Sequence, residues 1–201
     1  MTLQQKSLKL QLESIDPQKA GVHPLLIQRS SQANFASTEL ERGQIIQLLQ
    51  AARCAPSSHN SQPWYFIVVT NGAGREEINQ NLAESGVGWA AQAPVLLAVV
   101  FNSSEGSRQN GLNYGLFDCG LAAQNILLQA TSMNLAAHPV NYFDPQTMRR
   151  VLKLPRKHIL VLFVAVGQPG QQSVSTESNP LRKPLATIAA WDRWDGSLVE
   201  E

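Results

Sequence analysis

The chain has 201 residues, of which 43% are hydrophobic and 15% are charged, and its formal net charge is +1 at pH 7. At roughly 100–200 residues per domain, this length predicts one well-packed core, and the apolar content is typical of a globular chain. A nucleic-acid-binding protein normally carries a basic excess or a basic stripe, so the balanced charge argues against that class.

Local patterns also argue against a metal protein and a membrane protein. The two cysteines, Cys54 and Cys119, have no histidine at ligand spacing, and their apolar helical surroundings predict buried thiols in a reducing cytoplasm. The longest apolar run, residues 93–101, is shorter than the ~20 residues that span a bilayer. The first 16 residues lack the apolar core of a signal peptide. We therefore expect a soluble, cytoplasmic protein.

The N-terminal part of the chain is polar and weakly patterned. Residues 1–22 are expected to form an arm that wraps a partner subunit, or simply a frayed end, and residues 23–201 to form a single domain. Thr38 and Glu41 have the spacing of a capping box, which predicts a helix that begins there and is ended by Pro56. Its apolar residues recur at helical spacing: Ile45, Leu48, Leu49 and Ala52.

Three apolar, β-rich runs predict buried strands at residues 64–70 (WYFIVVT), 94–101 (PVLLAVVF) and 158–166 (HILVLFVAV). A short polar helix is expected at residues 75–84, between the first two strands. The alternation of strands and helices predicts an α+β or α/β architecture, a central sheet flanked by helices.

The most apolar helix is expected at residues 116–134, after a polar loop at 102–113. Because it is apolar on nearly every face, it should be buried all round, in a core or in a subunit interface. Gly120 within it costs about 1 kcal/mol relative to alanine, which is tolerable where another backbone approaches closely. A last helix is expected at residues 184–191.

Three segments concentrate hydrogen-bonding groups where the backbone must bend: residues 28–32 (QRSSQ), 55–64 (APSSHNSQPW) and 180–185 (PLRKPL). Arginines and serine hydroxyls suit a phosphate, and amide side chains suit the edge of a heterocycle. The chain has no glycine-rich loop of the Rossmann or Walker type, so side chains would have to hold a nucleotide. The first and third segments are also typical of ordinary solvated loops, whereas the second is unusually dense in polar groups.

The run APSSHNSQPWYFIVV resembles the signature loop of the nitroreductase-like flavoproteins. Four further segments resemble that family in the same order: HPLLIQRSSQANF, WAAQAPVLLAVV, DCGLAAQNILLQATSMNL, and VLFVAVGQPG followed by LRKPL. The resemblance covers about residues 23–190. It implies an α+β, three-layer fold with a mixed central sheet flanked by helices, and an intertwined homodimer with FMN in the seams between its subunits.

The resemblance also implies the residues that bind FMN. One subunit would hold the phosphate and ribityl chain with Arg29, Ser30, Ser31 and Arg182. The other subunit would reach in with Pro56, Ser57, Ser58 and Asn60. The turn at residues 139–142 would direct the backbone N–H of Asn141 toward flavin N5, and the flavin, with no catalytic side chain and no metal, would carry the chemistry. His59 and His138 lie near this predicted site, although a solvent-facing role is the plainer interpretation for both.

The family's chemistry implies that NADH or NADPH gives hydride to flavin N5 and that a small aromatic or quinone-like acceptor then takes its place, in ping-pong order. Two alternatives remain open: a specialised flavin enzyme such as a dehalogenase, a heterocycle oxidase or a flavin-destroying enzyme, and a non-catalytic flavin-binding module. Ala33 stands where relatives carry a basic residue, which favours weaker flavin retention. The segment Asn134–Ala136 replaces a common Gly-Leu-Gly and changes the floor of the predicted pocket.

Overall fold

The computed structural model describes residues 17–171 and 182–193. These residues fall into two compact units, which meet in the sequence between Gln28 and Arg29. The main unit, residues 29–171, contains the sheet and the helices that cover it. The second unit contains the helix α2 (Pro24–Gln28) and the short 3₁₀ turn η3 (Leu185–Thr187), so the helix expected at 184–191 is reduced to one turn. The predicted arm falls mostly outside the described residues, and its boundary at residue 22 stays a prediction.

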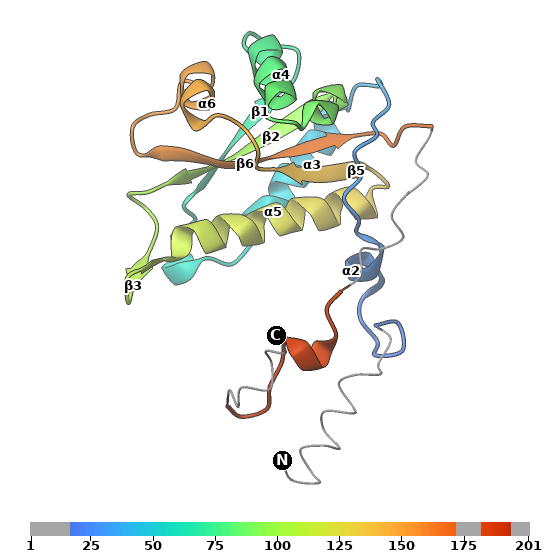
Figure 1. Ribbon diagram of the computed structural model, residues 1–201, viewed down its shortest axis with the longest axis vertical. Coiled ribbons are helices and arrows are strands. Elements are labelled where there is room, and N and C mark those ends of the chain that lie inside the picture. The colour runs from blue at the N-terminus through green and yellow to red at the C-terminus, as the bar shows by residue number, and fades with distance from the viewer. Residues whose placement is uncertain (1–16, 172–181, 194–201) are drawn as a thin grey trace. The chain divides into compact units, whose positions relative to one another are not determined.

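The main unit is built around a four-stranded sheet in the order β1–β2–β6–β5 (Figure 1). Three strands agree with the predicted runs: β1 (Trp64–Val69), β2 (Val95–Asn102) and β6 (His158–Gly167). The fourth, β5 (Ala136–Val140), includes Pro139 and Val140, which were expected in a turn. Its pairing with β6 explains the difference, because hydrogen bonds to a buried strand keep this short segment extended. All three neighbouring pairs are antiparallel, whereas the resemblance implied a mixed sheet.

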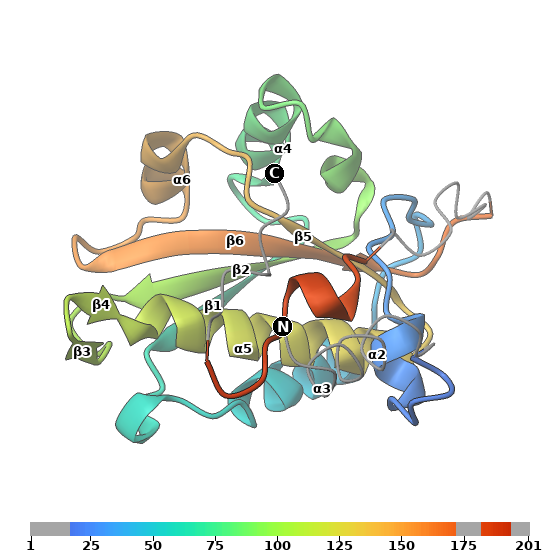
Figure 2. The ribbon, with the colours of Figure 1, turned by 60° about the horizontal axis from the view of Figure 1, so that its bottom comes forward.

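Helices cover both faces of this sheet (Figures 1 and 2). One face carries α3 (Arg42–Arg53) and α5 (Tyr114–Ser132); the other carries α4 (Arg75–Glu84), the 3₁₀ helix η2 (Gly88–Gln92) and α6 (Pro145–Val151). Alternate side chains of the fully buried β2 enter the two cores: Val95, Leu97 and Val99 on the α5 face, and Leu96, Ala98 and Val100 on the α4 face. This division confirms the α+β, three-layer class.

The ends of α3 differ from the prediction. The helix begins at Arg42, because the capping box consists of Glu41 and Gln44: the Glu41 N–H donates to Gln44 Oε1 at 3.0 Å. The helix ends at Arg53, and Cys54, predicted to be buried, is exposed at its C-terminal cap. The prediction for Cys119 is confirmed: burial, and then the charge of Asp118, raise the pKa of its thiol to about 12.

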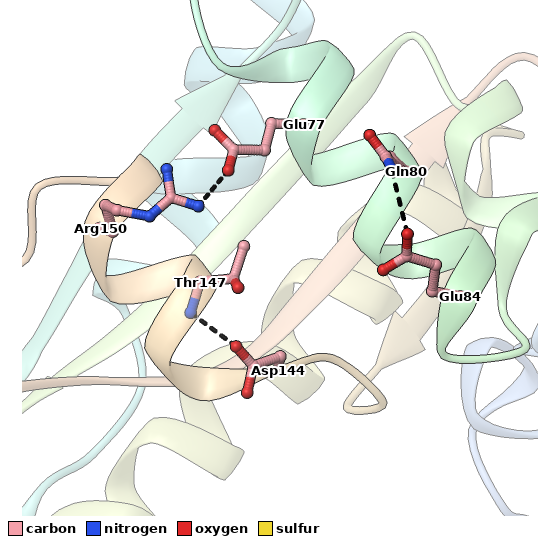
Figure 3. Close-up of polar contacts among 6 residues, drawn as sticks. All are labelled: Glu77, Gln80, Glu84, Asp144, Thr147 and Arg150. Atoms are coloured by element: carbon pink, nitrogen blue, oxygen red, sulfur yellow. Dashed lines mark hydrogen bonds and ion pairs between the residues drawn. The ribbon is translucent and has the colours of Figure 1, made fainter.

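Polar contacts between α4 and α6 hold the connection that follows β5 (Figure 3). Asp144 caps α6 by accepting the Thr147 N–H at 2.8 Å, and the pKa of Asp144 is lowered by its hydrogen bonds to Thr147. The buried Asn81 of α4 accepts the Asp144 N–H at 2.9 Å, and Arg150 of α6 pairs with Glu77 of α4. The start of α6, and with it the end of β5, is therefore fixed in place.

Part of the loop expected at 102–113 is a small β-hairpin. It consists of β3 (Arg108–Gln109) and β4 (Leu112–Asn113), joined by Asn110 and Gly111 with φ of 51° and 78°. Positive φ at both central residues is the signature of a type I′ turn, for which Asn-Gly is the preferred sequence.

Candidate functional site

The predicted phosphate-binding segment, residues 29–31, leads into a stretch that lies along β5. The Gln32 N–H donates to the Ala137 carbonyl at 3.3 Å, and Phe35 forms a β-bridge with Pro169. Arg29 and Ser30 are half-buried and Ser31 is exposed. Burial lowers the pKa of His138 in β5, and the positive charge of Arg29 adds to this lowering. The structure thus brings Arg29, Ser30 and Ser31 to the strand that precedes Asn141.

His138 is half-buried beside these residues. Its ring lies 4.3 Å from that of Trp89 between centroids, and Trp89 also stacks with Phe35 at 6.4 Å. Burial lowers the pKa of His138, the backbone of Gln32 raises it, and the charge of Arg29 lowers it further. The net direction is downward, so the neutral imidazole is favoured over the cation at this position.

Asn141 follows the last residue of β5 and is exposed, as is the side chain of Tyr142, at 67%. Phe143 packs edge-on against Phe163 of β6, with ring centroids 5.7 Å apart. The backbone between β5 and α6 is therefore anchored on both sides of Tyr142, while Asn141 stays accessible. This placement is compatible with a backbone N–H that faces a flat ligand, and the role of Asn141 stays a prediction.

The second predicted group of residues lies on the 3₁₀ turn η1 (Ser58–Asn60) and just before it. Three residues here have positive φ, namely His59 (54°), Asn60 (56°) and Gln62 (46°). Non-glycine residues in this region of φ cost of order 1 kcal/mol each and cluster at ligand-binding sites. Pro56 and Asn60 are exposed, and Ser57 and Ser58 are half-buried.

Two hydrogen bonds hold η1 in this conformation. Ser57 Oγ accepts the Gln62 N–H at 3.0 Å, and the carboxylate of Asp118 accepts the Ser58 N–H at 3.2 Å. Asp118 lies in the first turns of α5 and is only 2% exposed. Sequence reasoning missed this residue, although a lone carboxylate in the most apolar helix of the chain was a signal that could have revealed it.

The two groups of predicted site residues lie near opposite ends of α5. Ser58 is bonded to Asp118 near the start of the helix, whereas Gln32 is bonded to Ala137, beyond its C-terminus (Figure 1). At 1.5 Å per residue, the part of α5 that separates them is roughly 20 Å long. A single chain therefore does not bring the two groups together around one phosphate. Arg182 belongs to the second unit and is exposed there.

Unpartnered polar atoms mark both groups. Among the described residues, four buried side-chain atoms lack a hydrogen-bond partner, and three of them lie in or beside the predicted segments: Gln32 Oε1, Ser61 Oγ and His138 Nδ1. Buried polar atoms are normally satisfied, so these groups indicate a missing ligand or water. A guanidinium with hydroxyls in one group, and hydroxyls with amides in the other, fit the phosphate, ribityl chain and heterocycle of FMN.

The described residues contain no cluster of three or more His, Cys, Asp or Glu side chains placed to hold a metal ion. No helix within residues 17–171 and 182–193 has both the length and the apolar character that crossing a bilayer requires.

Comparisons with known proteins agree with the fold. The chain is 24% identical to an NADH dehydrogenase of Thermus thermophilus, over 82% of this chain and 93% of that protein. It is 26% identical to a 5,6-dimethylbenzimidazole synthase of Rhodospirillum rubrum, over 76% of this chain and 83% of that protein. A solved structure described as an oxidoreductase containing FMN superposes with a TM-score of 0.75 at 26% identity, covering 86% of this chain and 92% of that one.

The profile of the Nitroreductase family matches residues 26–87 and 79–168, which together make up most of the chain. The matched range includes the first predicted segment, the η1 loop, all four strands of the sheet and the helix between the two groups of site residues. The chain therefore belongs to the Nitroreductase family.

Proposed function

We propose that this protein is an FMN-dependent NAD(P)H oxidoreductase that acts as a homodimer, with each FMN held between two copies of the chain. The observation that carries the proposal is the separation of the two FMN-compatible groups of residues by the length of α5. Residues 29–31 and η1 fit parts of the same cofactor, yet they lie roughly 20 Å apart along one chain. In a dimer, η1 of one chain would lie beside residues 29–31 of the other, so each FMN would contact both groups of residues.

Two-fold symmetry would meet this requirement directly. If α5 of one chain runs antiparallel to α5 of its partner, η1 of each subunit comes to the Arg29 segment of the other, and two equivalent sites form. The surface of α5 supports such a contact. Leu116 and Phe117 are 48% and 63% exposed, and a Cβ at Gly120 would meet no atom within 4 Å beyond the surrounding turns of its own helix. An apolar stripe beside an open glycine fits close approach of another subunit.

Within each site the residues would have separate tasks. Arg29, with Ser30 and Ser31, would neutralise and orient the phosphate, and Asn60 would bond to a polar edge of the ring. The N–H of Asn141 would donate to the central part of the ring system. Bound FMN would supply the redox chemistry, taking hydride from NADH or NADPH and passing it to a small aromatic or quinone-like acceptor in ping-pong order.

The relatives support a redox reaction and leave its acceptor open. One is named as an NADH dehydrogenase and one solved structure as an oxidoreductase containing FMN, but another is named as a synthase of a heterocycle. A specialised flavin enzyme is therefore the second candidate.

Anaerobic addition of NADH or NADPH to the FMN-loaded protein tests the proposal. Rapid loss of the visible flavin absorbance, followed by its return when 1,4-benzoquinone is added, is the expected result. Loss of absorbance with dithionite alone would contradict the NAD(P)H oxidoreductase and favour the second candidate or a binding module. A strictly monomeric protein in light scattering, or one that binds no FMN, would contradict the shared site itself.

A further inference from the structure

The hairpin formed by β3 and β4 lies against the η1 loop. Gln109 Nε2 lies 3.5 Å from His59 Nε2, and His59 immediately precedes Asn60, one of the predicted FMN ligands. The hairpin and η1 both lie at the N-terminal end of α5, on the same side of the main unit (Figures 1 and 2). Whatever ligand η1 contacts is therefore within reach of side chains of the hairpin.

The base of the hairpin is firmly anchored. Asn113 Oδ1 accepts the Gly115 N–H at 3.0 Å, and the Tyr114 N–H donates to the Ser107 carbonyl at 2.9 Å. Gly106 and Gly115 lie so close to the ring of Phe101 that a Cβ on either would overlap it. With its type I′ turn, the hairpin is a short, well-supported ribbon that can hold side chains in defined positions.

The two faces of this ribbon differ. Gln109 pairs with Leu112 and Arg108 pairs with Asn113, and residues directly opposite in a pair share one face. The face of Gln109 and Leu112 is the one that meets His59. Leu112 is 61% exposed. This face combines an amide donor with an uncovered apolar side chain, whereas Arg108 projects from the other face.

We infer that Gln109 and Leu112, next to His59, form part of the surface that binds the electron acceptor, and that they select flat aromatic acceptors bearing an oxygen that accepts a hydrogen bond. The inference rests on the proposed function, because η1 must first hold FMN. The Gln109 amide has two N–H bonds and only a long contact to His59, so it can donate to a nitro or quinone oxygen. Leu112 would cover the ring of the same molecule.

The role of Gln109 and Leu112 is tested by measuring the equilibrium binding of an acceptor to the oxidised, FMN-loaded protein, without turnover. Nitrobenzene is titrated in the absence of NAD(P)H and followed through the flavin spectrum, with toluene as the matched ligand that lacks the oxygens. Loss of one neutral hydrogen bond in Gln109→Ala should raise the Kd for nitrobenzene roughly three- to tenfold and leave that for toluene within about twofold. Leu112→Ala should weaken both ligands.

Arg108→Ala is the matched control, since it truncates the neighbouring side chain on the other face of the hairpin. It should leave both Kd values within about twofold of the wild type. If nitrobenzene does not bind, or if Gln109→Ala and Arg108→Ala have the same effect, the inference is wrong while FMN binding and reduction by NAD(P)H still support the proposed function. A protein that binds no FMN would instead refute the proposed function itself.

Discussion

The shared site predicts that two defective chains can restore one another. We consider Arg29→Met, which removes the phosphate-binding charge but keeps an apolar stem, and Asn60→Asp, which replaces amide donors with a carboxylate. Asn60 has φ of 56°, a conformation that asparagine and aspartate both tolerate, and it is exposed, so neither the turn nor the core should be disturbed. In a dimer of one chain of each variant, one site contains both substitutions and the other contains neither.

The size of the effect follows from the contacts that are lost. Arg29→Met removes a hydrogen bond to the charged phosphate, which contributes about 1.5–3 kcal/mol, and Asn60→Asp puts a desolvated carboxylate where an amide bonded to the ring, a cost of similar size. Either variant as a homodimer should therefore bind FMN roughly 10- to 150-fold more weakly. At an FMN concentration about equal to the wild-type Kd, each wild-type site should be about half-filled and both variant homodimers should be mostly empty. The mixed dimer should then hold about half as much FMN as the wild type.

The measurement uses two affinity tags. The variants are co-expressed with different tags, the mixed dimer is purified over both, and bound FMN is counted from its visible absorbance after release. Each homodimer, checked for dimeric mass and for a wild-type melting temperature, is the control. A mixed dimer that is as empty as its parents would show that each site is built from one chain and that the separation along α5 has been misinterpreted.

Three further predictions concern single residues. Arg75→Met should lower the free energy of unfolding by about 2–4 kcal/mol in urea titrations. The buried guanidinium donates hydrogen bonds to three backbone carbonyls at 2.6–3.3 Å, which the variant loses, but the variant also avoids the cost of burying a charge. Iodoacetamide at pH 8 should label Cys54 in the native protein and reach Cys119, whose pKa is raised to about 12, only after unfolding, as mass spectrometry would show. Because burial lowers the pKa of His138 below 6.5, the unfolded chain takes up a proton that the folded chain does not. Stability should therefore fall as the pH drops below about 6.5, and fall less steeply in His138→Gln.

Much of the fold could be predicted because its signals are local. β1, β2, β6 and α5 each coincide with an apolar segment that identifies the element from its own residues, and α4 coincides with the short polar helix expected at 75–84. β5 could not be found in this way. Its sequence, AAHPV, contains a proline and a histidine and has no strand pattern, and the segment is extended because β6 pairs with it.

The candidate site likewise has parts that the sequence predicted and parts that it did not. The PSSHN loop and the Arg-Ser-Ser segment were recognisable as polar groups at bends, and their resemblance to a family gave them roles. The lone carboxylate of Asp118 was visible in the sequence, but its bond to η1 was not. The contacts of Trp89 with His138 and of the hairpin with His59 could not be predicted either, because each joins residues far apart in the chain.

The sequence by itself determined the type of most helices and strands, the polar character of the binding segments and the membership of a flavoprotein family. These features could be predicted because they depend on residue types and spacings within short segments of the chain. Only the tertiary structure decided that these segments lie near opposite ends of one helix, a separation that no single chain can close. The physical reason is that the length of α5 fixes the distance between its two ends. The sequence gives the length of this helix, but only the folded chain shows that one group of site residues lies at each end.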